Sequence, residues 1–215
     1  MRGISILLVV LSHAGNGFAK IFPGGLGVTI FFVISGFLIT NLLLQEIATT
    51  GSLNLKRFYF KRVLRLMPSL LFYLVLFVSV LLYLGSSITP LHIASGIFYF
   101  ANYYHIFIGY PPYNPLPILW SLAVEEHFYI IFPLLILLFR KNPLKILPFL
   151  CLLLALTPIW RTILYNSADF TKLRLQGSDA IFDCIIYGCV AAIFLHYDKV
   201  KYLTAKSLYL SIAIL

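Results

Sequence analysis

The sequence predicts an all-α protein, a polytopic bundle of transmembrane helices, and three features carry this prediction. Hydrophobic residues make up 61% of the 215 residues and charged residues only 11%, whereas soluble domains are about half apolar and a quarter charged. Several apolar runs can cross a hydrocarbon core of about 30 Å as helices of about 20 residues. These runs are continuous rather than alternating, which favours helices over the strands of a transmembrane barrel.

Seven apolar segments are expected to span or partly span the membrane: about 3–22, 25–45, 66–85, 119–139, 146–163, 180–196 and one that begins near residue 204. The start of the chain, basic and then apolar up to Ser12-His13-Ala14, could instead mark a signal peptide. Apolar character resumes almost at once, which favours a first transmembrane helix. The last run is still apolar at Leu215, so we expect further helices and interpret residues 1–215 as one incomplete membrane domain.

The basic loops between the runs predict the orientation of the chain. The loops at 46–65, 140–145 and 199–206 carry most of the lysines and arginines and should all face the cytoplasm. They can do so only if residues 91–108 do not cross fully, so we expect this segment to be re-entrant or to lie at the outer interface. Its histidines, tyrosines and asparagine suit such a place. The N-terminus is then inside.

The net charge of +9 does not indicate nucleic-acid binding, because the basic residues cluster between apolar runs as they do in cytoplasmic loops. The cysteines, Cys151, Cys184 and Cys189, all lie in apolar segments. Their spacing matches neither a metal site nor a disulfide framework, so we expect them to serve packing. The sequence predicts no metal and no tightly bound cofactor, and it leaves the oligomeric state open.

Two polar residues share one face of the first apolar segment. Arg2 and His13 are eleven positions apart, which is about 20° beyond three full helical turns and about 16 Å of rise. This places Arg2 at the cytoplasmic end and His13 near the midplane. Histidine can accept and return a proton near neutral pH, which makes His13 a candidate catalytic residue. The alternative is a packing histidine with a positive-inside arginine.

A second polar group lies in the run WSLAVEEHFY. Glu125 and Glu126 lie about 8 Å into their span, and charged groups there cost about 2.5–3.5 kcal/mol each, which makes them functional candidates. Adjacent residues point about 100° apart, so only one can face His13 and the other must pair elsewhere or stay protonated. Trp120 and Ser121, at the outer end of the same helix, are candidate substrate-binding residues.

Two further features stand out. Lys61, Arg62 and Arg65 belong to the run KRFYFKRVLRLMP, which suits phosphate groups of a cytosolic ligand but also simple anchoring to anionic lipid. Asp183 lies a few residues into its span and is a candidate catalytic carboxylate. In the same span Gly188 and Ala192 form a small-xxx-small pair that predicts close helix packing.

Taken together, these motifs resemble the acyltransferase 3 family of integral membrane O-acyltransferases. The matching pieces are Arg2 with His13, GGLGVTIFFVISGFLIT, FYFKRVLRLMP, WSLAVEEHFYIIFP and FDCIIYGCVAA, in the family's order. The resemblance implies a domain of about ten helices in a bacterial cytoplasmic (inner) membrane. Two positions depart from the family pattern: His127 stands where glutamine is common, and Ile181 where arginine is expected.

The function that the resemblance implies is transfer of an acyl group, expected to be acetyl, from cytosolic acyl-CoA (acetyl-CoA) to a hydroxyl of a cell-envelope glycan. In this hypothesis Lys61, Arg62 and Arg65 hold the CoA phosphates and Arg2 helps to draw in the donor. His13 is a general base or carries the acyl group, and Glu125 or Glu126 orients it or the acceptor. The alternatives are a proton-coupled transporter or exporter of a small molecule, which would use the same groups as a proton relay, and a structural membrane subunit.

Overall fold

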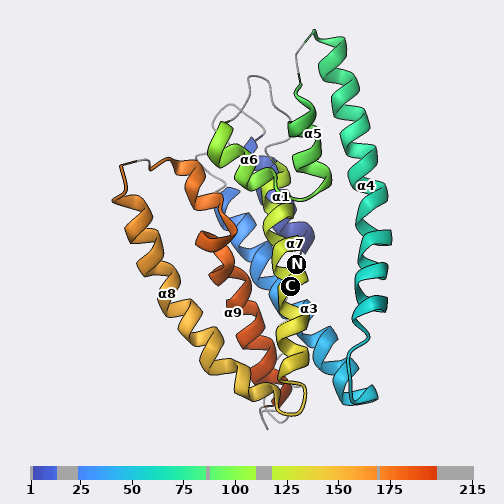
Figure 1. The fold of residues 1–215 in the computed structure, drawn as a ribbon, viewed down its shortest axis with the longest axis vertical. Coiled ribbons are helices and arrows are strands. Elements are labelled where there is room, and N and C mark those ends of the chain that lie inside the picture. Colours follow the sequence, from blue (N-terminus) through green and yellow to red (C-terminus); the bar gives the residue numbers. More distant parts are fainter. Residues whose placement is uncertain (1, 14–23, 86–87, 110–117, 169, 198–215) are drawn as a thin grey trace.

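The computed structural model describes residues 2–13, 24–85, 88–109, 118–168 and 170–197. They form helices and turns, without a strand, as Figure 1 shows. In chain order the helices are α1 (Arg2–His13), α3 (Gly24–Thr50), α4 (Leu55–Tyr83), α5 (Pro90–Ile97), α6 (Ala101–Ile108), α7 (Leu119–Leu138), η2 (Pro143–Ile146), α8 (Leu147–Tyr165), η3 (Lys172–Gln176) and α9 (Ser178–Tyr197).

Five segments of the described chain are long and apolar enough to cross a membrane, and they confirm the predicted class. They contain α3, α4, α7, α8 and α9. The main difference from the sequence prediction is in α4, which begins at Leu55 instead of near residue 66. The Asn54 side chain caps it by accepting a hydrogen bond from the backbone N–H of Arg57 at 2.9 Å, so the basic run belongs to the same helix as the apolar run.

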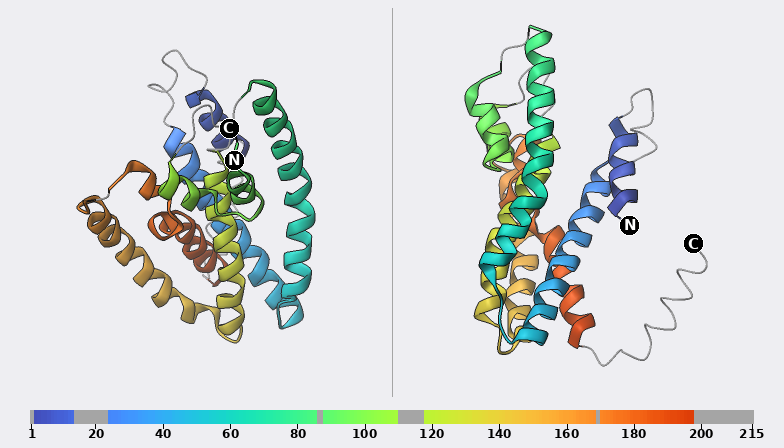
Figure 2. Two further views of the ribbon diagram at one scale, coloured as in Figure 1. Left: turned by 45° about the horizontal axis from the view of Figure 1, so that its top comes forward. Right: turned by 90° about the vertical axis from the view of Figure 1, so that its right-hand side faces the viewer.

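The two ends of the predicted set lie partly or wholly outside the described residues. α1 has 12 residues and stops at His13, and the predicted extension to residue 22 and the span from residue 204 are not among the described positions. α1 runs antiparallel to the first part of α3, because a Cβ at Gly27 would lie 2.7 Å from the Ser5 carbonyl oxygen and one at Gly24 would lie 2.9 Å from Ser12 Cβ. The right-hand view of Figure 2 shows α1 lying beside α3.

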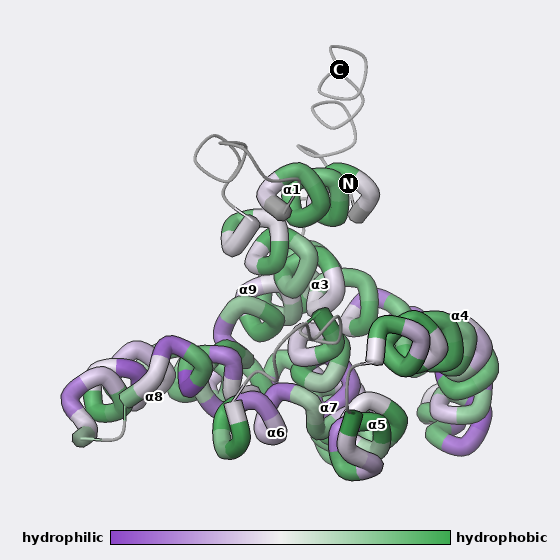
Figure 3. The backbone as a smooth tube through the Cα atoms, turned by 90° about the horizontal axis from the view of Figure 1, so that it is seen from above, coloured by the Kyte–Doolittle hydropathy of each residue, from purple (hydrophilic) through white to green (hydrophobic). Residues whose placement is uncertain are grey.

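The core of the bundle is the contact between α3 and α9. A Cβ at Gly188 would clash with the Val33 carbonyl oxygen, and a Cβ at Gly36 would clash with the Ile185 carbonyl oxygen. The missing side chains let the two backbones touch, as the small-xxx-small pattern at Gly188 predicts. Apolar residues of α3, α7 and α9 then fill the space around this contact. Figure 3 shows hydrophobic residues along most helices and hydrophilic ones gathered around α6 and α8.

Residues 90–108 do not form one helix. Thr89 caps α5 by accepting a hydrogen bond from the His92 N–H, and Tyr99 then interrupts the chain with a φ of 58° before α6 begins. Each of the two helices has 8 residues, about 12 Å of rise, which is too short to cross a membrane. The structure therefore favours the re-entrant or interfacial arrangement over a full crossing.

The helices have two distinct ends. The turns 51–54 and 139–142 lie at the same end, where the Arg140 guanidinium donates to Ser52 Oγ at 3.2 Å. We call this the basic end; it is at the bottom of Figure 1. The opposite end, here the far end, contains α5, α6 and the start of α9. Both described basic loops thus lie at one end, as their charge predicts.

Candidate functional site

An ion pair between α7 and α4 lies at the centre of the candidate site. Glu126 accepts hydrogen bonds from Arg62 Nε at 2.9 Å and Arg62 Nη2 at 2.5 Å. The Glu126 side chain is 9% exposed and the Arg62 side chain 21% exposed. Charges removed from water persist only when they are paired in good geometry, which a two-point contact provides. One of the two adjacent glutamates therefore pairs with a cation of another helix.

Tyr129 joins this ion pair to the second glutamate. The Arg62 guanidinium carbon lies 3.3 Å from the centre of the Tyr129 ring, a cation–π contact. The Tyr129 hydroxyl donates to Glu125 Oε1 at 2.6 Å and is 3.4 Å from the Ser35 carbonyl oxygen. The three α7 residues share this network because they lie within about one turn of one another. Both carboxylates are thus held inside the bundle by named partners.

A groove of about 790 Å³ leads to this site between α3 and the start of α4. Its α3 side runs from Leu38 to Thr50, which is about 18 Å of helix. Its α4 side carries Arg57, Lys61, Arg62 and Arg65, and Tyr129 closes it toward the bundle core. All three residues predicted to hold phosphates line this groove. Arg62 differs from the others because its guanidinium is committed to Glu126, so Arg57 joins Lys61 and Arg65 as a cation facing the groove.

Asp183 has a partner that the sequence did not indicate. The Arg161 guanidinium of α8 forms an ion pair with Asp183 and also donates from its Nε to the Ala180 carbonyl oxygen at 2.6 Å. The arginine expected two positions before Asp183 is absent, and a neighbouring helix supplies a cation instead. Asp183 lies on α9 and is 5% exposed. A catalytic role for Asp183 stays a prediction, since its observed contact is structural.

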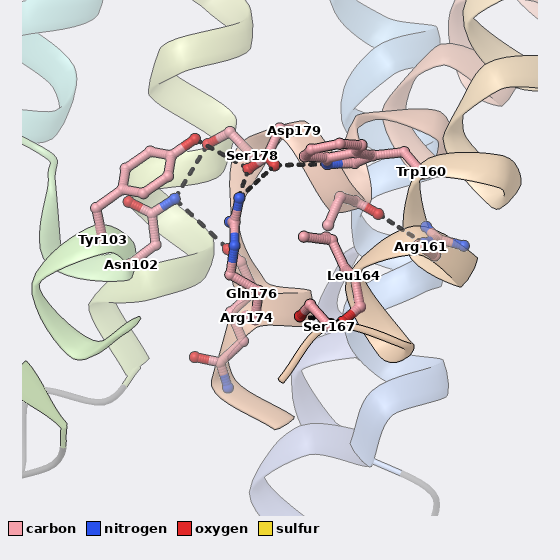
Figure 4. Close-up of polar contacts among 11 residues, drawn as sticks. Asn102, Tyr103, Trp160, Arg161, Leu164, Ser167, Arg174, Gln176, Ser178 and Asp179 are labelled. Carbon is pink, nitrogen blue, oxygen red and sulfur yellow. Dashed lines mark hydrogen bonds and ion pairs between the residues drawn. The ribbon is translucent and has the colours of Figure 1, made fainter. Parts of the chain in front are cut away.

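A polar cluster surrounds the start of α9 at the far end, as Figure 4 shows. Asp179 accepts from Trp160 Nε1 at 2.7 Å, from Arg174 Nη2 at 2.9 Å and from the Tyr103 hydroxyl at 3.2 Å. Beside it, Ser178 contacts side chains of α6 and α7, which are described below. The cluster ties α6, α7, α8 and α9 together on the side away from the basic groove.

The segment with Tyr99 contains a second buried polar group. The rings of His92 and Tyr104 stack at 4.7 Å with 3° between their planes, and His105 meets His92 edge-on at 5.7 Å. Burial lowers the pKa of His92. Burial first, and then the nearby His92, lower the pKa of His105 to about 4. Both rings are therefore neutral near neutral pH and stabilise the turn by stacking.

The remaining predicted residues lie on α1 and at the start of α7. Arg2 and His13 are helical, and their side chains lie outside the described part of the structure. Trp120 packs edge-on against Phe32 at 6.2 Å, and Ser121 Oγ donates to the Ile118 carbonyl oxygen at 3.1 Å. Roles for these residues in catalysis and substrate binding stay predictions.

Sequence reasoning missed several residues of these networks. Tyr129 could have been found from its spacing, because it follows Glu125 by four positions and Glu126 by three. Arg161 is a charged residue inside a predicted span, a signal that deserved the same weight as Asp183. Ser178 and Asn102 carried no such signal, because their partners are distant in sequence.

The helices are apolar, and their spans contain carboxylates paired with guanidinium groups. These features define an integral membrane protein with a polar site buried among its helices. The chain belongs to the acyltransferase 3 family, whose sequence model, described as an acyltransferase domain, matches residues 1–215.

Relatives carry names consistent with this family. The chain is 33% identical over 215 residues to the peptidoglycan O-acetyltransferase OatA of Listeria monocytogenes. The aligned region covers 94% of this chain and 34% of the relative. It is 30% identical over 209 residues to a Bacillus subtilis protein named "Putative peptidoglycan O-acetyltransferase YrhL", with 90% and 32% covered. The chain thus spans about a third of the length of these relatives. No solved structure matches it.

Proposed function

We propose that the chain is the membrane part of an O-acyltransferase that moves an acyl group, expected to be acetyl, from cytosolic acyl-CoA to a hydroxyl of a cell-envelope glycan. The observation that carries the proposal is the basic groove that ends at the Arg62–Glu126–Tyr129 network. The names of the relatives support acetyl as the group and peptidoglycan as the acceptor.

The groove suits a long ligand with phosphates at one end. Its α3 side extends for about 18 Å, from Thr50 at the basic end to Leu38, three turns along α3 toward the far end. Arg57, Lys61 and Arg65 offer charge-assisted hydrogen bonds to phosphate oxygens. An acyl thioester bound with its phosphates on these residues would reach toward Tyr129 with its acyl end.

Acid–base chemistry at the inner end of the groove follows from the buried carboxylates. In this proposal His13 takes the proton of the attacking hydroxyl or carries the acyl group, and Arg2 helps to draw in the donor. Glu126 is neutralised by Arg62. The other carboxylate, Glu125, accepts a hydrogen bond from the Tyr129 hydroxyl at 2.6 Å, and we assign it the role of orienting His13 or the acceptor. The N-terminus and the basic end face the cytoplasm.

Radiolabelled acetyl-CoA tests the proposal on membranes that contain the full-length protein. We expect label to appear in envelope glycan and the His13→Ala variant to lose it with unchanged expression. Lys61→Ala and Arg65→Ala should each raise KM for acetyl-CoA about tenfold, since a hydrogen bond to a charged group contributes about 1.5–3 kcal/mol. Lys141→Ala, at the basic end but outside the groove, is the matched control. Absence of label with the unaltered protein would favour the transporter alternative.

A further inference from the structure

The far end holds a serine and a histidine in contact that the reaction proposed above does not use. Ser178 is the first residue of α9, and its Oγ lies 2.7 Å from Nδ1 of His127 on α7. Nδ2 of Asn102 on α6 donates to the same oxygen at 3.1 Å. Either partner can donate the hydrogen bond between Ser178 Oγ and the imidazole, according to the tautomer of His127, and the tautomer with an unprotonated Nδ1 accepts the serine proton. This is the arrangement of a nucleophile and its base.

The imidazole also contacts α6, where the centre of the Tyr103 ring lies 6.0 Å from that of His127 with 30° between the planes. Tyr99, just before α6, has a φ of 58°, which lies in the left-handed region. This conformation costs a residue other than glycine about 1–2 kcal/mol, and such strain is concentrated at functional sites. A serine hydroxyl in contact with an imidazole is the pair that activates hydroxyl nucleophiles on unrelated folds.

Asn102 provides a second, independent observation. Its side-chain oxygen is buried and has no hydrogen-bond partner within the described part of the chain, while its nitrogen serves Ser178 and the Gln176 carbonyl oxygen. An unmet buried acceptor costs about 1–3 kcal/mol. A cluster that served packing alone would be more stable with this oxygen hydrogen-bonded. A hydroxyl or amide group of a bound molecule would donate to this oxygen.

The Ser178–His127 pair lies on a different face of α7 from the basic groove. His127 directly follows Glu126 and precedes Tyr129 of the groove by two positions, about 3 Å of rise and 200° of rotation.

We propose that Ser178 is an acyl-accepting nucleophile and His127 its general base, so that the acyl group passes through a serine ester on its way to the final hydroxyl. The inference rests on the proposed function for its donor, an acyl thioester. In the first step Ser178 Oγ bonds to the acyl carbon, the carbon–sulfur bond breaks, and the serine proton moves to His127 Nδ1 and then to the thiolate.

The second step regenerates the site. A hydroxyl of the acceptor attacks the ester carbon and gives its proton to His127. The bond between the acyl carbon and Ser178 Oγ breaks, and the serine oxygen takes the proton back from the imidazole. Asn102 is a positioning residue, since it acts through the serine.

Covalent trapping on the purified full-length protein tests the inference. The protein is incubated separately with acetyl-CoA and with p-nitrophenyl acetate, an activated ester that bypasses the groove, and its peptides are analysed by mass spectrometry. We expect one acetyl group on Ser178 with both donors and none at that position in Ser178→Ala. Ser178→Cys should instead form a thioester that neutral hydroxylamine releases. Ser167→Ala, a far-end serine whose hydroxyl binds the Leu164 carbonyl oxygen, is the control.

His127→Gln separates catalysis from packing. Glutamine keeps a hydrogen-bonding side chain beside Ser178 but cannot take a proton, so acylation should slow by about 10²–10⁴-fold and lose its pH dependence near neutrality. A packing role predicts a rate within about twofold in a variant that stays monodisperse in detergent.

Each outcome decides one proposal or the other. Acetylation of Ser178 by p-nitrophenyl acetate alone would support the serine nucleophile and overturn acyl-CoA as donor. Transfer of label to glycan at an unchanged rate by Ser178→Ala would overturn the serine ester and leave the proposed function in place. If Ser178 stays unmodified with both donors, the proposal of a serine ester is also overturned.

Discussion

Replacement of Glu126 by glutamine removes the carboxylate that neutralises Arg62 inside the bundle. The two side chains are 9% and 21% exposed, and the pair is bound at two points. Loss of one partner of such a buried pair costs about 3–5 kcal/mol, because the remaining charge is desolvated without compensation. The contact of the guanidinium with the Tyr129 ring remains and offsets part of this cost. We therefore expect a loss of about 3 kcal/mol in the free energy of unfolding.

Thermal unfolding of the full-length protein in detergent measures this loss. Soluble domains of 150–250 residues lose about 2–4 °C in Tm for each kcal/mol, so Glu126→Gln should lower Tm by about 6–12 °C. Glu46→Gln is the matched control. The Glu46 side chain lies nearer the surface and, among the described residues, accepts a hydrogen bond from the Asn54 N–H alone, at 3.0 Å, so its loss should cost about 1 kcal/mol or less.

A double-mutant cycle sharpens the result. Arg62→Met and Glu126→Leu should each destabilise the protein, whereas the double variant should lose less than the sum, because no unpaired charge is left in the bundle. A coupling energy below about 0.5 kcal/mol, or a Glu126→Gln variant as stable as the unaltered protein, would refute the inference that this pair is a buried, mutually neutralising contact.

Three further outcomes follow from the structure. Gly188→Ala places a methyl group against the backbone of α3 and should cost about 1–3 kcal/mol in thermal unfolding, whereas Gly25→Ala, with no atom within 4 Å of the added carbon, should be neutral or stabilising. The folded-state pKa of His105 is lowered from 6.5 to about 4, so the unfolded chain binds more protons between these values. Stability should be complete above about pH 6.5 and fall as the pH drops toward 4, and His105→Phe should flatten the Tm-against-pH curve. Arg161→Met leaves Asp183 buried without its cation and should lower Tm, and Asp183→Asn in the same chain should restore part of it.

The sequence predicted those parts of the fold that depend on local composition. Continuous hydropathy located five of the spans, and the small-xxx-small pattern at Gly188 predicted the close approach of α9. Charge bias placed the described basic loops at one end, where Arg140 and Ser52 meet. The helix α4 begins eleven residues before the predicted apolar span, because charged residues lower hydropathy without preventing a capped helix from extending beyond the membrane.

The candidate site was only partly predictable for a different reason. The residue types were evident, since carboxylates and cations inside apolar runs are costly and therefore conspicuous. Their partners were not, because Arg62 and Glu126 are 64 positions apart and Ser178 and His127 are 51 apart. Such contacts depend on how each helix is rotated about its own axis and which neighbour it packs against.

The sequence by itself thus determined that this protein is a helical membrane bundle, that its basic loops at 46–65 and 140–145 share one end, and that it carries acid–base groups within its spans. Only the tertiary structure decided which residues pair. Arg62 neutralises Glu126, and Arg161 is the cation beside Asp183. Ser178 contacts His127. Hydropathy is the sum of contributions from single residues and can be read along a chain. A hydrogen bond between two helices exists only once their faces, depths and crossing angles are fixed together by packing.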